Sequence, residues 1–201
     1  MSKPRAKSYG LPVEPKEVIF NPTPEQLREF TEQMPNTRIT VHNNTNTQTR
    51  VDSRSKLSTY VVTDTPELYD SQTITRAEYE RVAKIQNDYI RGCAMVVVDG
   101  YIGNDPDFRV PARLIIEKSN ANVAAMQQHL YYPLADGEGD GFEPRLTIIY
   151  TPNVPMPGYP ADRLIAVDLD NGVTRVFNSD YFGESKKGGL RMWNQIVYDR
   201  G

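Results

Sequence analysis

Short runs of β-branched and other apolar residues constrain the fold of this chain more than any other feature. Each run is short enough to be a strand and is bounded by turn-forming residues. Asn171 and Gly172 separate the last two runs, and this pair is typical of a tight hairpin. The pattern therefore predicts a sheet that contains hairpins. The runs lie at residues 37–42, 60–62, 94–98, 108–116, 146–150, 164–169 and 173–177.

Helical patterns lie between these runs. Thr23 and Thr75 are each followed three residues later by Gln26 or Glu78, which is the capping box of a helix start. Helices that alternate with strands in this way predict an α/β fold, with α+β as the alternative, in which helices flank a mixed β-sheet. The four predicted helices cover residues 24–34, 76–91, 122–130 and 184–198.

The length and composition favour one domain preceded by an arm. With 201 residues, of which 38% are hydrophobic, the chain is long enough to bury a core. Residues 1–20 are rich in Pro and Lys and lack periodicity, so we expect an extended arm or tail there. Residues 21–201 are expected to form the domain. The nearly uniformly polar stretch 43–58 lies between two predicted strands and is a candidate site.

Composition also excludes several classes of partner. No run approaches the roughly 18 apolar residues of a membrane span, so we expect no membrane. The 23 basic and 26 acidic residues are evenly mixed, unlike the basic field of a nucleic-acid-binding protein. Cys93 is the one cysteine and cannot form an internal disulfide, which favours the reducing cytoplasm. Asp99, Asp105 and Asp107 cluster as metal ligands do, but we interpret them as turn formers.

Three blocks of sequence point to a known family. Residues 96–117 (VVVDGYIGNDPDFRVPARLIIE) contain an apolar strand, a Gly-Asn-Asp-Pro turn and an arginine-bearing returning strand. Residues 180–192 (DYFGESKKGGLRM) contain a Tyr-x-Gly-Glu-x-Lys-Lys segment, and residues 54–62 (RSKLSTYVV) place Arg-Ser before a strand. In this order and spacing, the blocks resemble the amino-terminal, substrate-binding domain of the ATP-dependent phosphoenolpyruvate carboxykinases.

The resemblance implies an activity for the full-length enzyme. That enzyme is a carboxy-lyase of gluconeogenesis that converts oxaloacetate and ATP to phosphoenolpyruvate, CO2 and ADP with Mn²⁺ and Mg²⁺. The sequence contains no Gly-x-x-x-x-Gly-Lys-[Ser/Thr] phosphate-binding loop. We therefore expect this chain to lack the carboxy-terminal nucleotide-binding domain, to be inactive alone, and to hold no ordered metal or nucleotide.

The resemblance also implies roles for individual residues. Arg54 is expected to grip oxaloacetate, phosphoenolpyruvate or CO2, because a guanidinium matches a planar carboxylate. Arg50 is the alternative, if the register is shifted by four residues. Tyr181 is expected to hold the substrate carboxylate. Lys187 is expected to bind the catalytic manganese in the full-length enzyme as a neutral amine. Lys186 is expected either to contact substrate phosphate or to tune the pKa of Lys187. Taken alone, each is most simply a solvated or half-buried residue.

Two other interpretations remain open from the sequence. In the first, the chain is a non-catalytic domain that binds a carboxylate. In the second, it belongs to a divergent carboxykinase-like enzyme with another phosphate donor or keto acid. Residues 52–58 depart from the Thr-Gly-Arg-Ser-Pro-Lys-Asp loop of the family, and this departure permits the second interpretation. Nucleotide preference and oligomeric state do not follow from the sequence.

Overall fold

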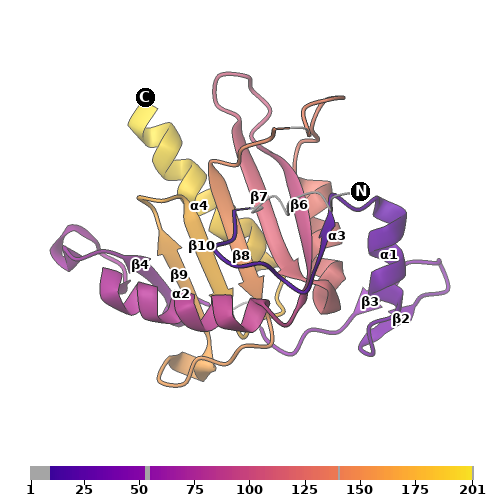
Figure 1. Cartoon of the computed structure of the whole chain (residues 1–201), viewed down its shortest axis with the longest axis horizontal. Coiled ribbons are helices and arrows are strands. Elements are labelled where there is room, and N and C mark those ends of the chain that lie inside the picture. The colour runs from indigo at the N-terminus through magenta and orange to yellow at the C-terminus, as the bar shows by residue number, and fades with distance from the viewer. Residues whose placement is uncertain (1–9, 53–54, 140, 201) are drawn as a thin grey trace, which may run out of the picture.

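A mixed eight-stranded sheet forms the centre of the computed structural model, which describes residues 10–52, 55–139 and 141–200 (Figure 1). β6 pairs antiparallel with β7, and β9 pairs antiparallel with β10, whereas the other neighbours are parallel. The predicted mixed sheet is confirmed. In sheet order the strands are β1 (Glu17–Phe20), β6 (Ala94–Ile102), β7 (Val110–Glu117), β8 (Leu146–Thr151), β10 (Val173–Phe177), β9 (Leu164–Asp168), β4 (Thr59–Val62) and β5 (Thr73–Ile74).

Helices cover both faces of this sheet. α2 (Arg76–Ile90) lies on the near face in Figure 1, and α3 (Ala121–Leu130) and α4 (Gly183–Arg200) lie on the far face. α1 (Pro24–Glu32) packs on α3 beyond the sheet edge. The α/β fold class is therefore confirmed, with helices flanking the sheet as expected.

The two faces are buried because successive strand residues point to opposite sides. In β6, Val96 and Val98 belong to the core beneath α3 and α4. Met95 and Val97 instead pack with Ile90 of α2. The strand is thus apolar on both faces, which explains why its sequence is a continuous apolar run rather than an alternating one.

The predicted helix starts and hairpins agree with the structure. Thr23 caps α1 with both hydrogen bonds of the capping box, one to and one from Gln26. Thr75 accepts a hydrogen bond from the amide of Glu78 at the start of α2. Val173 pairs with Asp168 across the predicted Asn-Gly turn.

Three short strands were not predicted. β1 lies within the segment expected to be an arm and adds a parallel edge strand to β6. β3 (Thr45–Thr47) lies within the predicted polar loop and pairs with β2 (Thr37–Ile39) outside the main sheet. β5 adds two residues at the other edge. Such strands need little apolar surface, because backbone hydrogen bonds and contacts such as Thr37 Oγ1–Thr47 Oγ1 (2.7 Å) hold them.

The interpretation of Asp99 as a turn former is wrong, because Asp99 lies inside β6. Its carboxylate accepts two hydrogen bonds from Arg113 of β7, at 2.6 and 2.7 Å, and both side chains are buried. Asp105 does form the predicted turn, since its Oδ1 accepts a hydrogen bond from the amide of Asp107. The first sequence block thus encodes a buried ion pair between neighbouring strands.

Gly189 lets α4 lie close to the sheet. A Cβ at this position would come within 2.7 Å of Ile102 Cδ1. Gly188 and Gly189 are poor helix formers, yet α4 runs without a break through both. The close approach to Ile102 is compatible with glycine at position 189. In the described part of the chain, no helix has the length and apolar character needed to cross a membrane.

Candidate functional site

A cleft of about 780 Å³ lies between the first turns of α4 and the segments that flank β4 and β5. Its walls come from three parts of the chain that are distant in sequence. The cleft is more basic than acidic, with three cationic side chains and one carboxylate. The lining residues are Ser55, Lys56, Leu57, Thr59, Asp70, Ser71, Gln72, Lys187 and Arg191.

Lys187 is one of the cations that line this cleft. Its Nζ donates hydrogen bonds to Ser55 Oγ at 2.8 Å and to Glu184 Oε1 at 2.9 Å. The Glu184 side chain is completely buried, whereas the Lys187 side chain is 32% exposed. A lysine ammonium has three N–H donors, so one remains for a ligand. Lys187 is therefore fixed in place by the protein and still open to the cleft.

Tyr181 lies directly beneath this amine. The Lys187 Nζ is 5.5 Å from the centre of the Tyr181 ring, within the range of a cation–π contact. Gly183 makes room for the ring, because a Cβ there would lie 2.3 Å from Tyr181 Cε1. The Tyr181 carbonyl accepts a hydrogen bond from Tyr150 Oη at 2.7 Å. The structure thus brings together two of the predicted site residues.

Asp180 joins the predicted polar loop to the start of α4. Its buried carboxylate accepts hydrogen bonds from the backbone amides of Arg50 and Val51, at 2.8 and 3.2 Å. Arg54 lies outside the described residues. Val51, before it in the chain, and Ser55, after it, are both tied to the segment 180–187, through Asp180 and through Lys187 respectively.

The side chain of the alternative arginine, Arg50, already forms hydrogen bonds within the protein. Its Nε lies 3.3 Å from Asp180 Oδ2 and its Nη2 donates to the carbonyl of Pro152 at 2.8 Å. Lys186 is exposed on α4 and does not line the cleft. The geometry therefore gathers Tyr181 and Lys187, and leaves Lys186 outside the group.

Three residues of the site were missed from the sequence. Glu184 and Arg191 lie three residues before and four residues after Lys187, so helical spacing places all three on one stripe of α4. That spacing was a usable signal for both. Ser55 carried no signal, because its partner is 132 positions away. The importance of Glu184 as a buried partner of Lys187 depends on its burial, which only the structure shows.

Lys187 is the one predicted metal ligand. Within residues 10–52, 55–139 and 141–200, no group of three or more His, Cys, Asp or Glu side chains is placed to hold a metal ion. The Lys187 amine donates to two oxygen atoms, and Glu184 is its nearest acidic neighbour. The described residues alone do not make up a manganese site.

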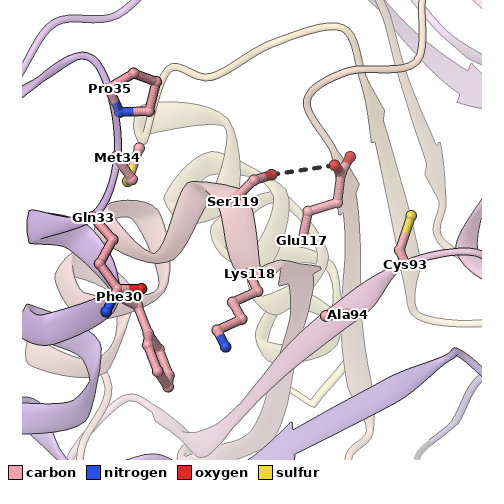
Figure 2. Close-up of a pocket in the computed structure, with 9 residues that line it drawn as sticks. All are labelled: Phe30, Gln33, Met34, Pro35, Cys93, Ala94, Glu117, Lys118 and Ser119. Carbon is pink, nitrogen blue, oxygen red and sulfur yellow. Dashed lines mark hydrogen bonds between the residues drawn. The ribbon is translucent and has the colours of Figure 1, made fainter.

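A second pocket, of about 420 Å³, lies between the end of α1, the start of β6 and the end of β7 (Figure 2). Its carboxylate, Glu117, already accepts hydrogen bonds from Tyr89, Ser119 and Asn153. Burial raises the pKa of the Cys93 thiol in the same pocket, and the negative charge of Glu117 raises it further. The thiol therefore stays protonated. We interpret Glu117 as a structural hub that joins α2, β7 and the loop after β8.

The fold and the Lys187 cleft together define an α/β domain with a cleft in which cationic side chains outnumber carboxylates. The chain belongs to the phosphoenolpyruvate carboxykinase family, since the model of the family described as phosphoenolpyruvate carboxykinase matches residues 16–201. The resemblance inferred from the three sequence blocks is confirmed.

Curated relatives agree with this assignment. The chain is 30% identical over 159 residues, or 74% of its length, to phosphoenolpyruvate carboxykinase (ATP) 1 of Moorella thermoacetica. It is 24% identical over 149 residues, or 69% of its length, to phosphoenolpyruvate carboxykinase (ATP) 2 of the same organism. A phosphoenolpyruvate carboxykinase (ATP) of Caldanaerobacter subterraneus is 23% identical over 70% of the chain. The matched regions span 28–30% of the length of these relatives.

Proposed function

We propose that this chain is the substrate-binding domain of an ATP-dependent phosphoenolpyruvate carboxykinase. The proposed reaction converts oxaloacetate and ATP to phosphoenolpyruvate, CO2 and ADP, as in gluconeogenesis. Membership of the family and the names of the relatives support the assignment. The observation that carries it is the position of Lys187, which is held over Tyr181 by Ser55 and Glu184 at the edge of a basic cleft.

The chemistry of this reaction suits a cationic cleft. The bond between the departing carboxylate and the adjacent carbon breaks, and its electron pair forms the enolate of pyruvate. The enolate oxygen then attacks the terminal phosphorus of ATP, and ADP leaves. Negative charge grows on the enolate oxygen, and positive charge fixed nearby stabilises it without having to reorganise. Lys187 is the residue proposed to hold this positive charge in the full-length enzyme, as a neutral amine that would ligate Mn²⁺.

The other predicted residues take supporting roles in the proposal. Tyr181 would orient the substrate carboxylate, Arg54 would bind the same carboxylate or the released CO2, and Lys186 would meet phosphate. In the full-length enzyme, Mn²⁺ with Lys187 among its ligands, and Mg²⁺ with ATP, would supply Lewis-acid stabilisation and the phosphoryl group. The remaining ligands and the nucleotide-binding loop would come from a carboxy-terminal domain. We propose a cytoplasmic enzyme that acts on small molecules and has no nucleic-acid or membrane partner.

Substitution of Lys187 by arginine in the full-length protein tests the proposal. Arginine keeps the positive charge but is larger, has a planar fork of donors and cannot give up its proton. We expect Lys187→Arg to lower kcat for phosphoenolpyruvate formation by about 100-fold or more. Lys84→Arg, at an exposed site on α2, is the matched control and should retain activity. A fully active Lys187→Arg enzyme would remove Lys187 from the mechanism.

A further inference from the structure

Arg191 is a cation in the cleft that the proposed function does not use. It lies one helical turn after Lys187 on α4 and lines the same cleft. Its Nη1 is buried and has no hydrogen-bond partner among the described residues. A buried guanidinium nitrogen without an acceptor is unfavourable, and the group stays charged. The Arg191 guanidinium, which lines this cleft, thus has a donor that no acceptor in the described part of the protein satisfies.

The nearby carboxylates do not neutralise the cleft. Glu184 is bound through Oε1 to Lys187, and its Oε2 has no hydrogen-bond partner in the described part of the chain. Asp70 lies on the exposed rim. Burial lowers the pKa of Arg191, and the charge of Glu184 opposes that change without removing it. Three cations, Lys56, Lys187 and Arg191, therefore face two carboxylates, and the excess is positive.

We propose that Arg191 binds one of the two anionic groups of a ligand that enters the cleft beside Lys187 and Tyr181, so that Arg191 selects dianions over monoanions. This inference rests on the proposed function, because it places the ligand in the same cleft. Residues four apart on a helix have Cβ atoms about 5–6 Å from each other. That spacing fits a short ligand that carries two carboxylates, or one carboxylate and one phosphoryl group.

Direct binding to the 201-residue chain tests the proposal without any turnover. The probes are succinate, a four-carbon dicarboxylate, butyrate, the four-carbon monoanion, and phosphonoacetate, which carries a carboxylate and a phosphonate. Binding is followed by NMR titration of the wild type, Arg191→Gln, Arg191→Lys and Arg38→Gln. Arg38 is exposed on β2, outside the residues that line the cleft, and serves as the charge-matched control.

We expect succinate to bind the wild type about 10-fold or more tightly than butyrate, because a charge-assisted hydrogen bond is added. Arg191→Gln should remove that difference, Arg191→Lys should keep part of it, and Arg38→Gln should keep all of it. Comparison of succinate with phosphonoacetate shows whether Arg191 prefers a carboxylate or a phosphoryl group. Thermal unfolding of each variant confirms that it is folded.

The proposal is overturned if folded Arg191→Gln keeps the preference for succinate, or if the wild type binds succinate and butyrate equally well. It is also overturned if neither anion shifts the signals of Lys187 and Arg191. These outcomes are distinct from failure of the proposed function, which appears as a full-length wild-type protein that forms no phosphoenolpyruvate from oxaloacetate and ATP. A full-length protein without that activity, together with a strong succinate preference that depends on Arg191, would leave Arg191 as the specificity residue of another reaction.

Discussion

The Nζ of Lys187 lies 2.8 Å from the Oγ of Ser55, although 132 residues separate the two in the sequence. This hydrogen bond links two walls of the cleft, α4 and the polar segment before β4. Ser55 is 2% exposed and thus belongs to the interior of the domain rather than to a solvated loop. The contact explains why the second and third sequence blocks form a single site.

Replacement of Glu184 by glutamine should destabilise the domain. Glu184 is buried and forms the ion pair that holds the Lys187 amine. Removing one partner of such a pair leaves the other charge with poorer compensation, and Lys187 is partly solvated, so we expect a loss of about 1–3 kcal/mol in the free energy of unfolding. Urea unfolding measures it. Glu32→Gln, which breaks the exposed pair with Arg28, should cost less than about 0.5 kcal/mol. Equal losses in the two variants would contradict this ranking.

Asp180→Asn should release the backbone at residues 50 and 51. The Asp180 carboxylate accepts hydrogen bonds from both amides, and asparagine replaces one acceptor oxygen by a donor. Hydrogen exchange of the Arg50 and Val51 amides should accelerate about 10-fold or more. Amides in the centre of β8 serve as the internal reference and should not change. Unaltered exchange at residues 50 and 51 would show that other contacts hold this segment.

Gly183→Ala should displace the Tyr181 ring. A Cβ at position 183 would overlap the ring at 2.3 Å, so either the ring or the helix start must move. We expect a loss of about 1–3 kcal/mol in stability, and a change in the near-ultraviolet circular dichroism of tyrosine. Gly139→Ala is the control, because a Cβ at that position meets no atom within 4 Å. A native tyrosine signal in Gly183→Ala would argue against close packing of the ring.

Asp168 should make stability depend on pH below about pH 4. Burial alone raises the pKa of Asp168, but hydrogen bonds from Arg76 and Asn171 outweigh it, and the net pKa lies below the ordinary value. A lowered pKa in the folded state means that the stabilisation is complete above the unfolded value of about 3.9 and is lost as the pH falls through the folded value.

The comparison of wild type with Asp168→Asn makes this measurable. The variant should be less stable by about 2–4 kcal/mol at pH 7, because it leaves the partly buried Arg76 without its carboxylate. The difference should be constant from pH 5 to pH 8 and shrink towards pH 2, as denaturant unfolding at each pH would show. Asp170→Asn, at a 78% exposed neighbour, should have little effect. A difference that grows on acidification would reverse the sign of the inferred shift.

The sequence alone determined the elements whose signals are local. Capping at Thr23 and Thr75, the Asn-Gly hairpin before Val173 and the apolar runs of the central strands depend on residues within a few positions of each other. Local hydrogen bonds and side-chain periodicity fix these elements, so a single sequence is sufficient to predict them. The family followed from the same kind of short-range pattern, in the blocks around Asp99 and Lys187.

The tertiary structure decided everything that depends on distant contacts. The buried Asp99–Arg113 pair, the Ser55–Lys187 hydrogen bond and the burial of Glu184 each require strands or helices to be placed side by side. Edge strand β1 also depends on its neighbour, because its backbone pairs only with β6. Whether a charged residue is solvated or buried changes its chemistry, and the packing of segments remote in sequence determines that burial.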